Sequence, residues 1–382
     1  AFNLFVFFEV LLIASYGLMI HAGGGMRLRA GLQYVVMNLA GSTLFLFAMG
    51  TLYAVTGTLN MADMALRVRE IAPGDQALLL TGAMMLLIVF GIKAAAFPVQ
   101  FWLPGTYVNA PAPVAAFFAI LTKVGIYAIL RMYTLVFGAD AAAIGDFFRE
   151  LLLPAGSLTL IVGAIGVMGA KQLPRLASFA VLASMGTLLI SLSIGTQAGL
   201  TATLYYLLHS TLAAAALFLV LDLVADSQGP TIRAPGGLVA VLYFIAAIAV
   251  AGMPPLSGFI GKLMVLDASR ALPGAALIWA TILTTSLLII IGFAYRGSRY
   301  FWKPLDPDFA NPDNLDADGN PVAAHPIRPL AITATCLPIA LLVLLSLGAG
   351  PVMQFMSDTA AQLLDTAGYI EAVLGPQGGA AP

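Results

Sequence analysis

Residues Leu86–Phe137 read LLIVFGIKAAAFPVQFWLPGTYVNAPAPVAAFFAILTKVGIYAILRMYTLVF, and this stretch decides the class of fold. Two apolar runs, Ala77–Leu103 and Pro113–Phe137, meet at a proline-rich bend, and each run carries a single lysine, Lys93 or Lys123. Neither lysine has an acidic neighbour on its own run. An ionisable group at bilayer depth costs about 2.5–3.5 kcal/mol on insertion scales, so its default interpretation is an ion or proton pathway. The stretch therefore predicts membrane helices of an ion transporter.

The composition of the whole chain supports a membrane protein. Of the 382 residues, 60% are hydrophobic and 9% are charged, against roughly 25% charged in soluble domains. The net charge of −1 gives no basic patch for nucleic acid. A single cysteine excludes an intrachain disulfide, and the absence of a Cys/His cluster predicts neither a metal site nor a cofactor. The sequence begins inside an apolar run without a signal peptide, so we expect further helices before it.

Ten segments of the sequence are long enough to cross a bilayer, which takes about 20 apolar residues. Only helices and closed barrels satisfy every backbone polar group in lipid, and these runs are too long for barrel strands. We therefore predict an all-α, polytopic membrane protein. Its ten spans are Phe2–Ile20, Leu32–Val55, Ala77–Leu103, Pro113–Phe137, Leu151–Ala170, Leu176–Ile194, Leu200–Ala225, Leu238–Leu266, Ala275–Phe293 and Leu330–Leu347.

Two of these segments exceed a simple span and contain proline, at Pro98 in the first and at Pro254 and Pro255 in the second. A proline inside a helix removes a hydrogen bond and clashes with the preceding turn. A plain kink is the common outcome, but Lys93 and Lys262 lie within eight residues of the two sites. Paired broken helices point to the binding site of a transporter, so we predict two broken helices.

Four ionisable residues lie inside apolar runs: Glu9, Lys93, Lys123 and Lys262. One acid cannot neutralise three bases. Desolvation disfavours a charged ammonium and a nearby carboxylate favours it, so such lysines can load and release a proton near neutral pH. Two alternatives stay open, namely that Lys262, near the end of its run, reaches the interface, and that Glu9 serves only as a hydrogen-bonding group between helices.

His209, in the run YYLLHSTLAAAALF, is a candidate proton relay because imidazole titrates at ordinary pH. A satisfied core histidine is the competing interpretation. Asp222, near the end of the same run, is a possible exit or relay group, whereas Asp226 fits an interfacial position.

Four motifs in order carry a resemblance to a known family: FNLFVFFEVLLIASYGLM, GIKAAAFPVQFWLP, NAPAPVAAFFAILTKVGIYAILR and AGMPPLSGFIGK. They resemble the large antiporter-like subunits shared by respiratory complex I and the Mrp multisubunit Na⁺/H⁺ antiporters, with the Mrp D-subunit group the most similar. The likeness covers residues 1 to about 303. It implies a fourteen-helix fold with two inverted five-helix repeats and a broken helix in each, and a bacterial cytoplasmic (inner) membrane location.

On this resemblance the ten spans are the fifth to fourteenth helices of the family. Residues 1–137 are then a truncated first repeat and 151–303 the second repeat. Residues 304–329 form a polar loop, and residues 330–382 form a C-terminal helix and tail. The loop contains NPDNLDADGN, which imitates the start of a calcium loop, but His325 stands where such a loop needs a glutamate. The tail after Gln362 is expected to be disordered.

The resemblance also implies roles for the buried charges. Glu9 matches the family's intramembrane glutamate, Lys93 its partner lysine, Lys123 the lysine of the central axis and Lys262 the lysine of the second broken helix. The chain departs from the pattern at Gly105, where many relatives have an acid. It also has Ala213 and Ala214, where relatives often have a lysine after the histidine.

The leading expectation is a proton-translocating subunit of a multisubunit Na⁺ (cation)/H⁺ antiporter. Its partners are then the other subunits of a hetero-oligomeric membrane complex, H⁺ and Na⁺ or another monovalent cation, and the lipid bilayer. One alternative is the homologous proton-pumping subunit of a respiratory NADH:quinone oxidoreductase or membrane-bound hydrogenase. A second alternative is a structural membrane subunit that moves no ion.

Overall fold

The computed structural model of the chain describes residues 1–138, 141, 147–227, 237–302 and 329–375, and every regular element in these residues is an α-helix. The predicted all-α membrane fold is confirmed. Among the described helices, nine are long and apolar enough to cross a membrane. They are α1 (Phe2–Ile20), α2 (Gly25–Thr56), α4 (Gln76–Lys93), α6 (Ala112–Leu135), α7 (Phe147–Gly169), α8 (Leu173–Ser193), α9 (Gln197–Ser227), α12 (Ala275–Trp302) and α13 (Pro329–Leu347).

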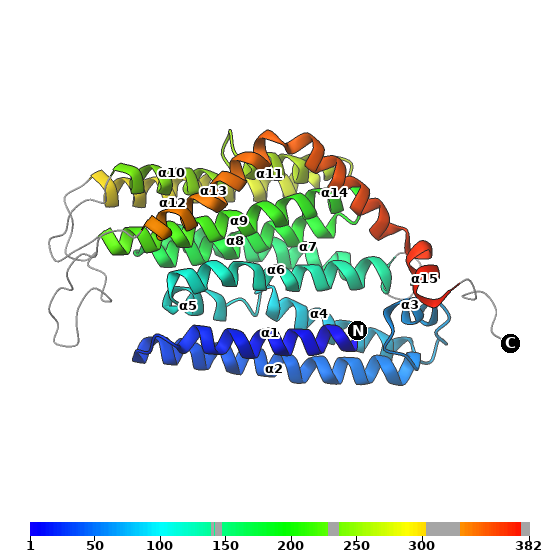
Figure 1. Cartoon of the computed structure of the whole chain (residues 1–382). Helices are drawn as coiled ribbons and strands as arrows, with labels where there is room; N and C mark the ends of the chain where they lie inside the picture. Colours follow the sequence, from blue (N-terminus) through cyan, green and yellow to red (C-terminus); the bar gives the residue numbers. More distant parts are fainter. Residues whose placement is uncertain (139–140, 142–146, 228–236, 303–328, 376–382) are drawn as a thin grey trace.

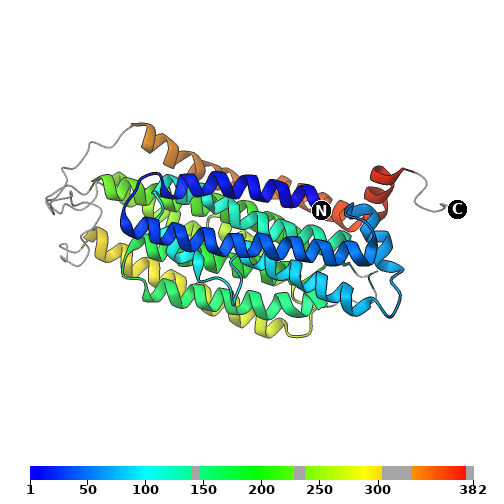
Figure 2. The same ribbon diagram turned by 90° about the horizontal axis from the view of Figure 1, so that it is seen from below.

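The long helices run side by side in one bundle (Figure 1). α1 and α2 lie at one side of it, α10, α12 and α13 lie at the other, and α6, α8 and α9 run between them; Figure 2 gives the view from below. Burial follows this order. Of the apolar 18-residue stretch of α8, 89% is buried, whereas 22% of the corresponding stretch of α1 is buried. The centre of the bundle is therefore at α8 and its neighbours.

Two spans are interrupted at their prolines, as predicted. α4 ends at Lys93 and α5 (Trp102–Asn109) follows, so that Pro98 lies in the non-helical residues between them. The second break separates α10 (Gly237–Ala251) from α11 (Ser257–Ala268). Both breaks contain a cis peptide bond, before Pro98 and before Pro255. Neither helix continues through its proline, so these sites are breaks and not kinks.

The order of elements is similar in the two halves of the chain. Two long helices, α1 and α2, precede the broken helix α4/α5, and α6 follows it. In the same way α8 and α9 precede the broken helix α10/α11, and α12 follows it. This order is compatible with two repeats. The division into residues 1–137 and 151–303 stays a prediction.

The expectation of a disordered tail after Gln362 is wrong up to Gly375. α14 (Ala349–Leu364) and α15 (Thr366–Leu374) follow α13. Both helices are only partly apolar, which is why a search for membrane-length runs passed over them. The polar loop with His325 and the residues after Gly375 lie outside the described residues.

α14 and α15 form a C-terminal arm that descends along one end of the bundle to the short helix α3 (Met61–Arg69) (Figure 1). The guanidinium of Arg131 lies 4.1 Å from the centre of the Tyr369 ring, a cation–π contact. Nη2 of Arg69 donates to Oγ1 of Thr366 at 3.3 Å. Asp365 caps α15 by accepting from the backbone N–H of Gly368. These contacts order a segment whose hydropathy alone predicts little.

Glycines allow α7 and α8 to approach closely. A Cβ atom at Gly163 of α7 would lie 2.5 Å from the backbone nitrogen of Ala183, and one at Gly156 would lie 2.8 Å from that of Ile190. Such distances leave no room for a side chain. Small residues at helix interfaces give membrane helices their packing contacts, so this pair anchors the bundle.

We predict that Gly163→Ala lowers the thermal stability of the purified protein because the new methyl group overlaps the α8 backbone. Overpacking of this kind costs about 1–3 kcal/mol, which lowers the midpoint of thermal unfolding in detergent by several degrees. Gly169→Ala, at the end of α7, is the matched control, since nothing lies within 4 Å of a Cβ atom there. Equal midpoints for both variants would contradict the close packing.

Candidate functional site

Lys93 is the last residue of α4, at the edge of the first break, and its side chain is buried. Nζ donates to Oδ1 of Asn38 on α2 at 3.1 Å and lies 5.8 Å from the centre of the Phe8 ring. The ammonium borders a cavity of about 20 Å³ between α1, α2, α5 and α6, enough for about one water molecule. Lys93 is therefore a buried base with one direct polar partner and space beside it.

Glu9 lies on α1 and is partly buried. Its carboxylate accepts a hydrogen bond from the Ser42 hydroxyl on α2. Within the described part of the chain, Glu9 and Lys93 form no direct ion pair. Both residues instead contact side chains of α2 that lie four residues apart, Glu9 at Ser42 and Lys93 at Asn38. The predicted acid–base pair is thus separated by α2 side chains and is not in contact.

Polar groups freed at the first break find partners from two directions. The indole N–H of Trp102 donates to the carbonyl of Ile92 at 2.9 Å, and the backbone N–H of Phe97 donates to Oγ1 of Thr159 on α7 at 2.8 Å. Ala95 adopts a left-handed conformation with φ 51°. A buried residue held there is strained, so the bend is fixed by its neighbours and not by local preference.

Lys123 lies in the middle of α6, and only 2% of it is exposed. Its Nζ has no hydrogen-bond partner among the described residues. Gly125 brings α6 against the first break, because a Cβ atom there would lie 2.6 Å from the backbone nitrogen of Ala94. The central lysine thus sits on the helix that packs directly on the broken segment.

Lys262 lies on α11, and its side chain is turned inward. Nζ donates to the carbonyl of Ala251 at 2.8 Å and to Oγ of Ser286 on α12 at 2.9 Å. Gly252, with φ 74°, makes room, because a Cβ atom there would lie 2.8 Å from Cδ of Lys262. The residue is 7% exposed. This placement does not fit the alternative in which the lysine reaches the interface.

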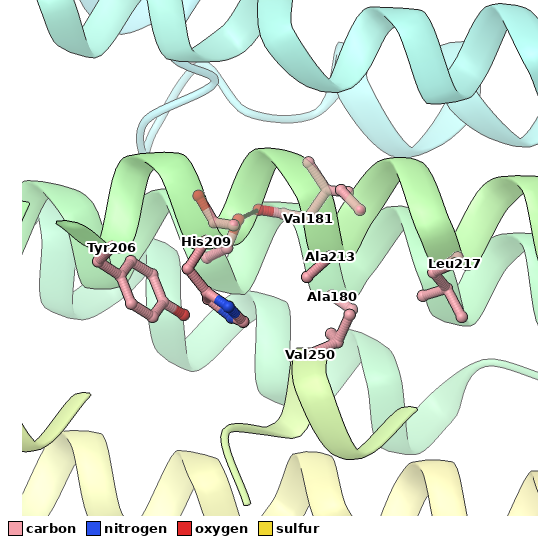
Figure 3. Close-up of a pocket in the computed structure, with 11 residues that line it drawn as sticks. Ala180, Val181, Tyr206, His209, Ala213, Leu217 and Val250 are labelled. Carbon is pink, nitrogen blue, oxygen red and sulfur yellow. Dashed lines mark hydrogen bonds between the residues drawn. The ribbon is translucent and has the colours of Figure 1, made fainter. Parts of the chain in front are cut away.

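His209 is buried on α9 and faces the second break (Figure 3). Nδ1 lies 2.9 Å from Oγ of Ser257, and the ring also bonds to the carbonyl of Ala249. A neutral ring satisfies both contacts if Nε2–H donates to the carbonyl and Nδ1 accepts from the serine. The histidine is thus well satisfied in this state, and its role as a relay stays a prediction.

A cavity of about 10 Å³ lies beside His209, between α8, α9 and α10 (Figure 3). Ala213 and Ala214 line it, together with Tyr206 and Ser210. Its size is at the lower limit for a single water molecule. The small side chains of Ala213 and Ala214 thus leave space beside the histidine.

The structure does not bring Asp222 into either cavity. The residue is partly buried on α9, and it interacts with another residue. The side chain of Asp226 lies outside the described residues. The described part of the chain contains no group of three or more His, Cys, Asp or Glu residues that could hold a metal ion.

Several polar partners of the site residues and of the first break were not predicted from the sequence. They are Asn38, Ser42, Thr159, Ser257 and Ser286. Asn38 and Ser42 stand four residues apart in an apolar helix, which places them on one face. That spacing was a usable signal. The serines and the threonine gave none, because such residues often bond to their own helix backbone.

Comparison with known proteins gives consistent results. Residues 1–289 match the family model described as "NADH:quinone oxidoreductase/Mrp antiporter, TM". The chain is 38% identical to a probable K⁺/H⁺ antiporter D-subunit of Rhizobium meliloti and 37% identical to a Na⁺/H⁺ antiporter D-subunit of Bacillus subtilis. Each alignment covers 98% of this chain and 73% of the relative. Among solved structures, a chain of the Mrp complex from Dietzia sp. superposes with a TM-score of 0.82 at 28% identity, over 98% of this chain and 76% of that one.

Proposed function

Because the chain belongs to the NADH:quinone oxidoreductase/Mrp antiporter family of membrane subunits, we propose that it moves protons within a multisubunit Na⁺ (cation)/H⁺ antiporter. It is a cation/H⁺ antiporter-like membrane subunit, a transporter component and not an enzyme. The two relatives are subunits of antiporters for different cations, K⁺ for the probable antiporter of Rhizobium meliloti and Na⁺ for that of Bacillus subtilis. The proposal therefore specifies a monovalent cation.

The observation that carries the proposal is the set of three buried lysines, none of which has a carboxylate in direct contact among the described residues. Lys93 and Lys262 are held by neutral oxygens at the two breaks, and Lys123 has no hydrogen-bond partner in the described part of the chain. Neutral oxygens can hold either an ammonium or an amine, so Lys93 and Lys262 can each exchange a proton without breaking an ion pair.

The proposed route runs from Lys93 through Lys123 and His209 to Lys262. Glu9 stands at its beginning and favours the charged form of Lys93. His209 is the proposed intermediate for the crossing because it is buried on α9 and its Nδ1 lies 2.9 Å from Oγ of Ser257 on α11, the helix that carries Lys262. The route ends at Lys262, which lies at the second break. Repeats at residues 1–137 and 151–303 would then each supply one broken helix.

The alternative of a respiratory pump subunit uses the same residues, so geometry does not separate the two. Purification of the intact complex and identification of its subunits does. We expect small multi-pass membrane subunits to co-purify with the chain. Iron–sulfur subunits in the same complex would overturn the antiporter assignment in favour of a respiratory one.

Lys93→Ala should abolish cation-driven proton movement, because it removes the titratable group at the first break. The measurement is proton uptake by vesicles from cells that lack their own antiporters, with normal assembly of the complex verified. We expect a loss of at least about tenfold, the effect of 1.4 kcal/mol in an equilibrium. Lys171→Ala, on an exposed loop residue, is the control. Wild-type activity of Lys93→Ala would refute the proposed function.

Glu9 should act through its charge. Glu9→Asp keeps a carboxylate and should retain partial activity, whereas Glu9→Gln should lose most of it because the neutral amide no longer favours the ammonium of Lys93. The same vesicle assay measures both, with Glu150→Gln on the exposed start of α7 as control. If Glu9→Gln transports normally, the residue is only a hydrogen-bonding strut.

His209→Ala should slow transport without blocking assembly, since protons must then cross between Lys123 and Lys262 without the imidazole. The double variant His209→Ala/Ala214→Lys should recover part of the rate, because position 214 lines the cavity beside the ring. Rates in the vesicle assay are compared with those of His21→Ala, an exposed histidine. An unchanged rate for His209→Ala would make the residue a packed core histidine.

A further inference from the structure

We propose that Asn38 and Ser42 of α2 are positioning residues through which Glu9 controls Lys93. Neither residue titrates, and neither carries the proton. The inference rests on the proposed function, because it assumes that Lys93 exchanges protons. It adds that the acid works through a fixed, neutral bridge and not through an ion pair.

The Asn38 end of the bridge is oriented by its own second hydrogen bond. Nδ2 donates to the carbonyl of Tyr34 at 2.9 Å, one turn earlier on α2. This contact directs the other side-chain atom, Oδ1, toward Lys93, where it accepts from Nζ at 3.1 Å. Asn38 is 2% exposed. An amide held in this way offers the ammonium an acceptor that cannot rotate to present its N–H groups.

The Ser42 end of the bridge holds the acid. Its hydroxyl contacts the Glu9 carboxylate, and it also lies 2.9 Å from the backbone carbonyl of Asn38. Because residues four apart share one face of a helix, Ser42 keeps the carboxylate on the face that carries Asn38. The order of contacts from α1 to α4 is thus Glu9, Ser42, Asn38 and Lys93.

Other groups around the ammonium do not replace this bridge. Among the described residues that line the cavity, Tyr34 is the other titratable one, and its hydroxyl is bonded to that of Ser15 at 2.9 Å. α5 and α6 contribute Trp102 and Leu121 to the same wall, and the Trp102 N–H is used at the break. Within the described residues, Asn38 is the hydrogen-bond acceptor for Lys93.

A neutral bridge has a functional consequence that a direct ion pair lacks. A carboxylate in contact with the ammonium would hold the proton firmly on the lysine. At the distance set by Ser42 and Asn38, the same carboxylate favours the charged form while leaving the proton free to depart. Loss of the bridge should therefore make the lysine harder to protonate, and transport should require a lower pH.

The first test compares variants of Ser42 in the complete complex, using the vesicle assay across a range of pH. Ser42→Ala should lower transport roughly tenfold, the factor for one lost hydrogen bond to a charged group. It should also move the pH profile toward acid by about half a unit to one unit. Ser42→Thr, which keeps the hydroxyl, should resemble the wild type. Thr43→Ala is the matched control, because its exposed hydroxyl bonds only to the carbonyl of Leu39.

The second test restores the charge from a new position. Asn38→Asp places a carboxylate directly beside Lys93, so in the Glu9→Gln background it should recover part, but not all, of the lost transport. Its pH profile should lie on the alkaline side of the wild type, because a carboxylate in contact holds the proton on the lysine more firmly than the bridge does. In that background Ser42→Ala should have no further effect, since the bridge then leads to no charge. Asn38→Leu alone should resemble Ser42→Ala in transport rate and pH profile. If the Asn38→Leu complex does not assemble, the comparison of Ser42→Ala with Ser42→Thr tests the inference without it.

The outcomes separate this inference from the proposed function. If Lys93→Ala abolishes transport but Ser42→Ala has both the rate and the pH profile of the wild type, Glu9 acts on Lys93 without the bridge and the inference is wrong. A wild-type rate and pH profile for the assembled Glu9→Gln/Asn38→Asp complex would also contradict it, because a direct ion pair would then serve as well as the bridge. If Lys93→Ala itself transports normally, the proposed function fails first.

Discussion

The structure depends on the need to satisfy backbone polar groups at two helix breaks inside an apolar bundle. In lipid, an unpartnered backbone group costs several kcal/mol, so irregular backbone is tolerated only where it is covered or lines a cavity. At the first break, Trp102 covers the carbonyl of Ile92 and Thr159 covers the N–H of Phe97. At the second, Lys262 binds the carbonyl of Ala251. The inward position of Lys262 follows from this requirement.

The two breaks are satisfied by different kinds of group. The first uses an indole and a hydroxyl, which cannot titrate, and its lysine turns to Asn38. The second uses an ammonium directly, with His209 on a further carbonyl of the same helix end. A change of protonation at Lys262 therefore acts on the backbone of the break itself. A change at Lys93 acts on α2 instead.

The fold and the charged residues could be predicted from the sequence, because apolar runs of membrane length and isolated charges within them are strong signals. The two breaks followed from their prolines. The contacts between the charges could not be predicted, since they depend on how helices distant in sequence are rotated. Glu9 and Lys93 were expected to act as a pair, but the α2 side chains that lie between them could not be foreseen. The C-terminal arm was missed because α15 is held by single polar and aromatic contacts and not by an apolar run.

The contact between that arm and α3 has a consequence for biogenesis. Thr366 lies 297 positions after its partner Arg69 in the sequence. Tyr369 likewise lies far beyond its partner Arg131 in the sequence. Since a chain emerges from the ribosome beginning at its N-terminus, α3 and this end of α6 are inserted long before α15 exists. The arm can pack against α3 and α6 only after the intervening helices have entered the membrane. Its docking thus marks a completed bundle, and a chain stalled during insertion leaves that end uncovered for quality-control proteases.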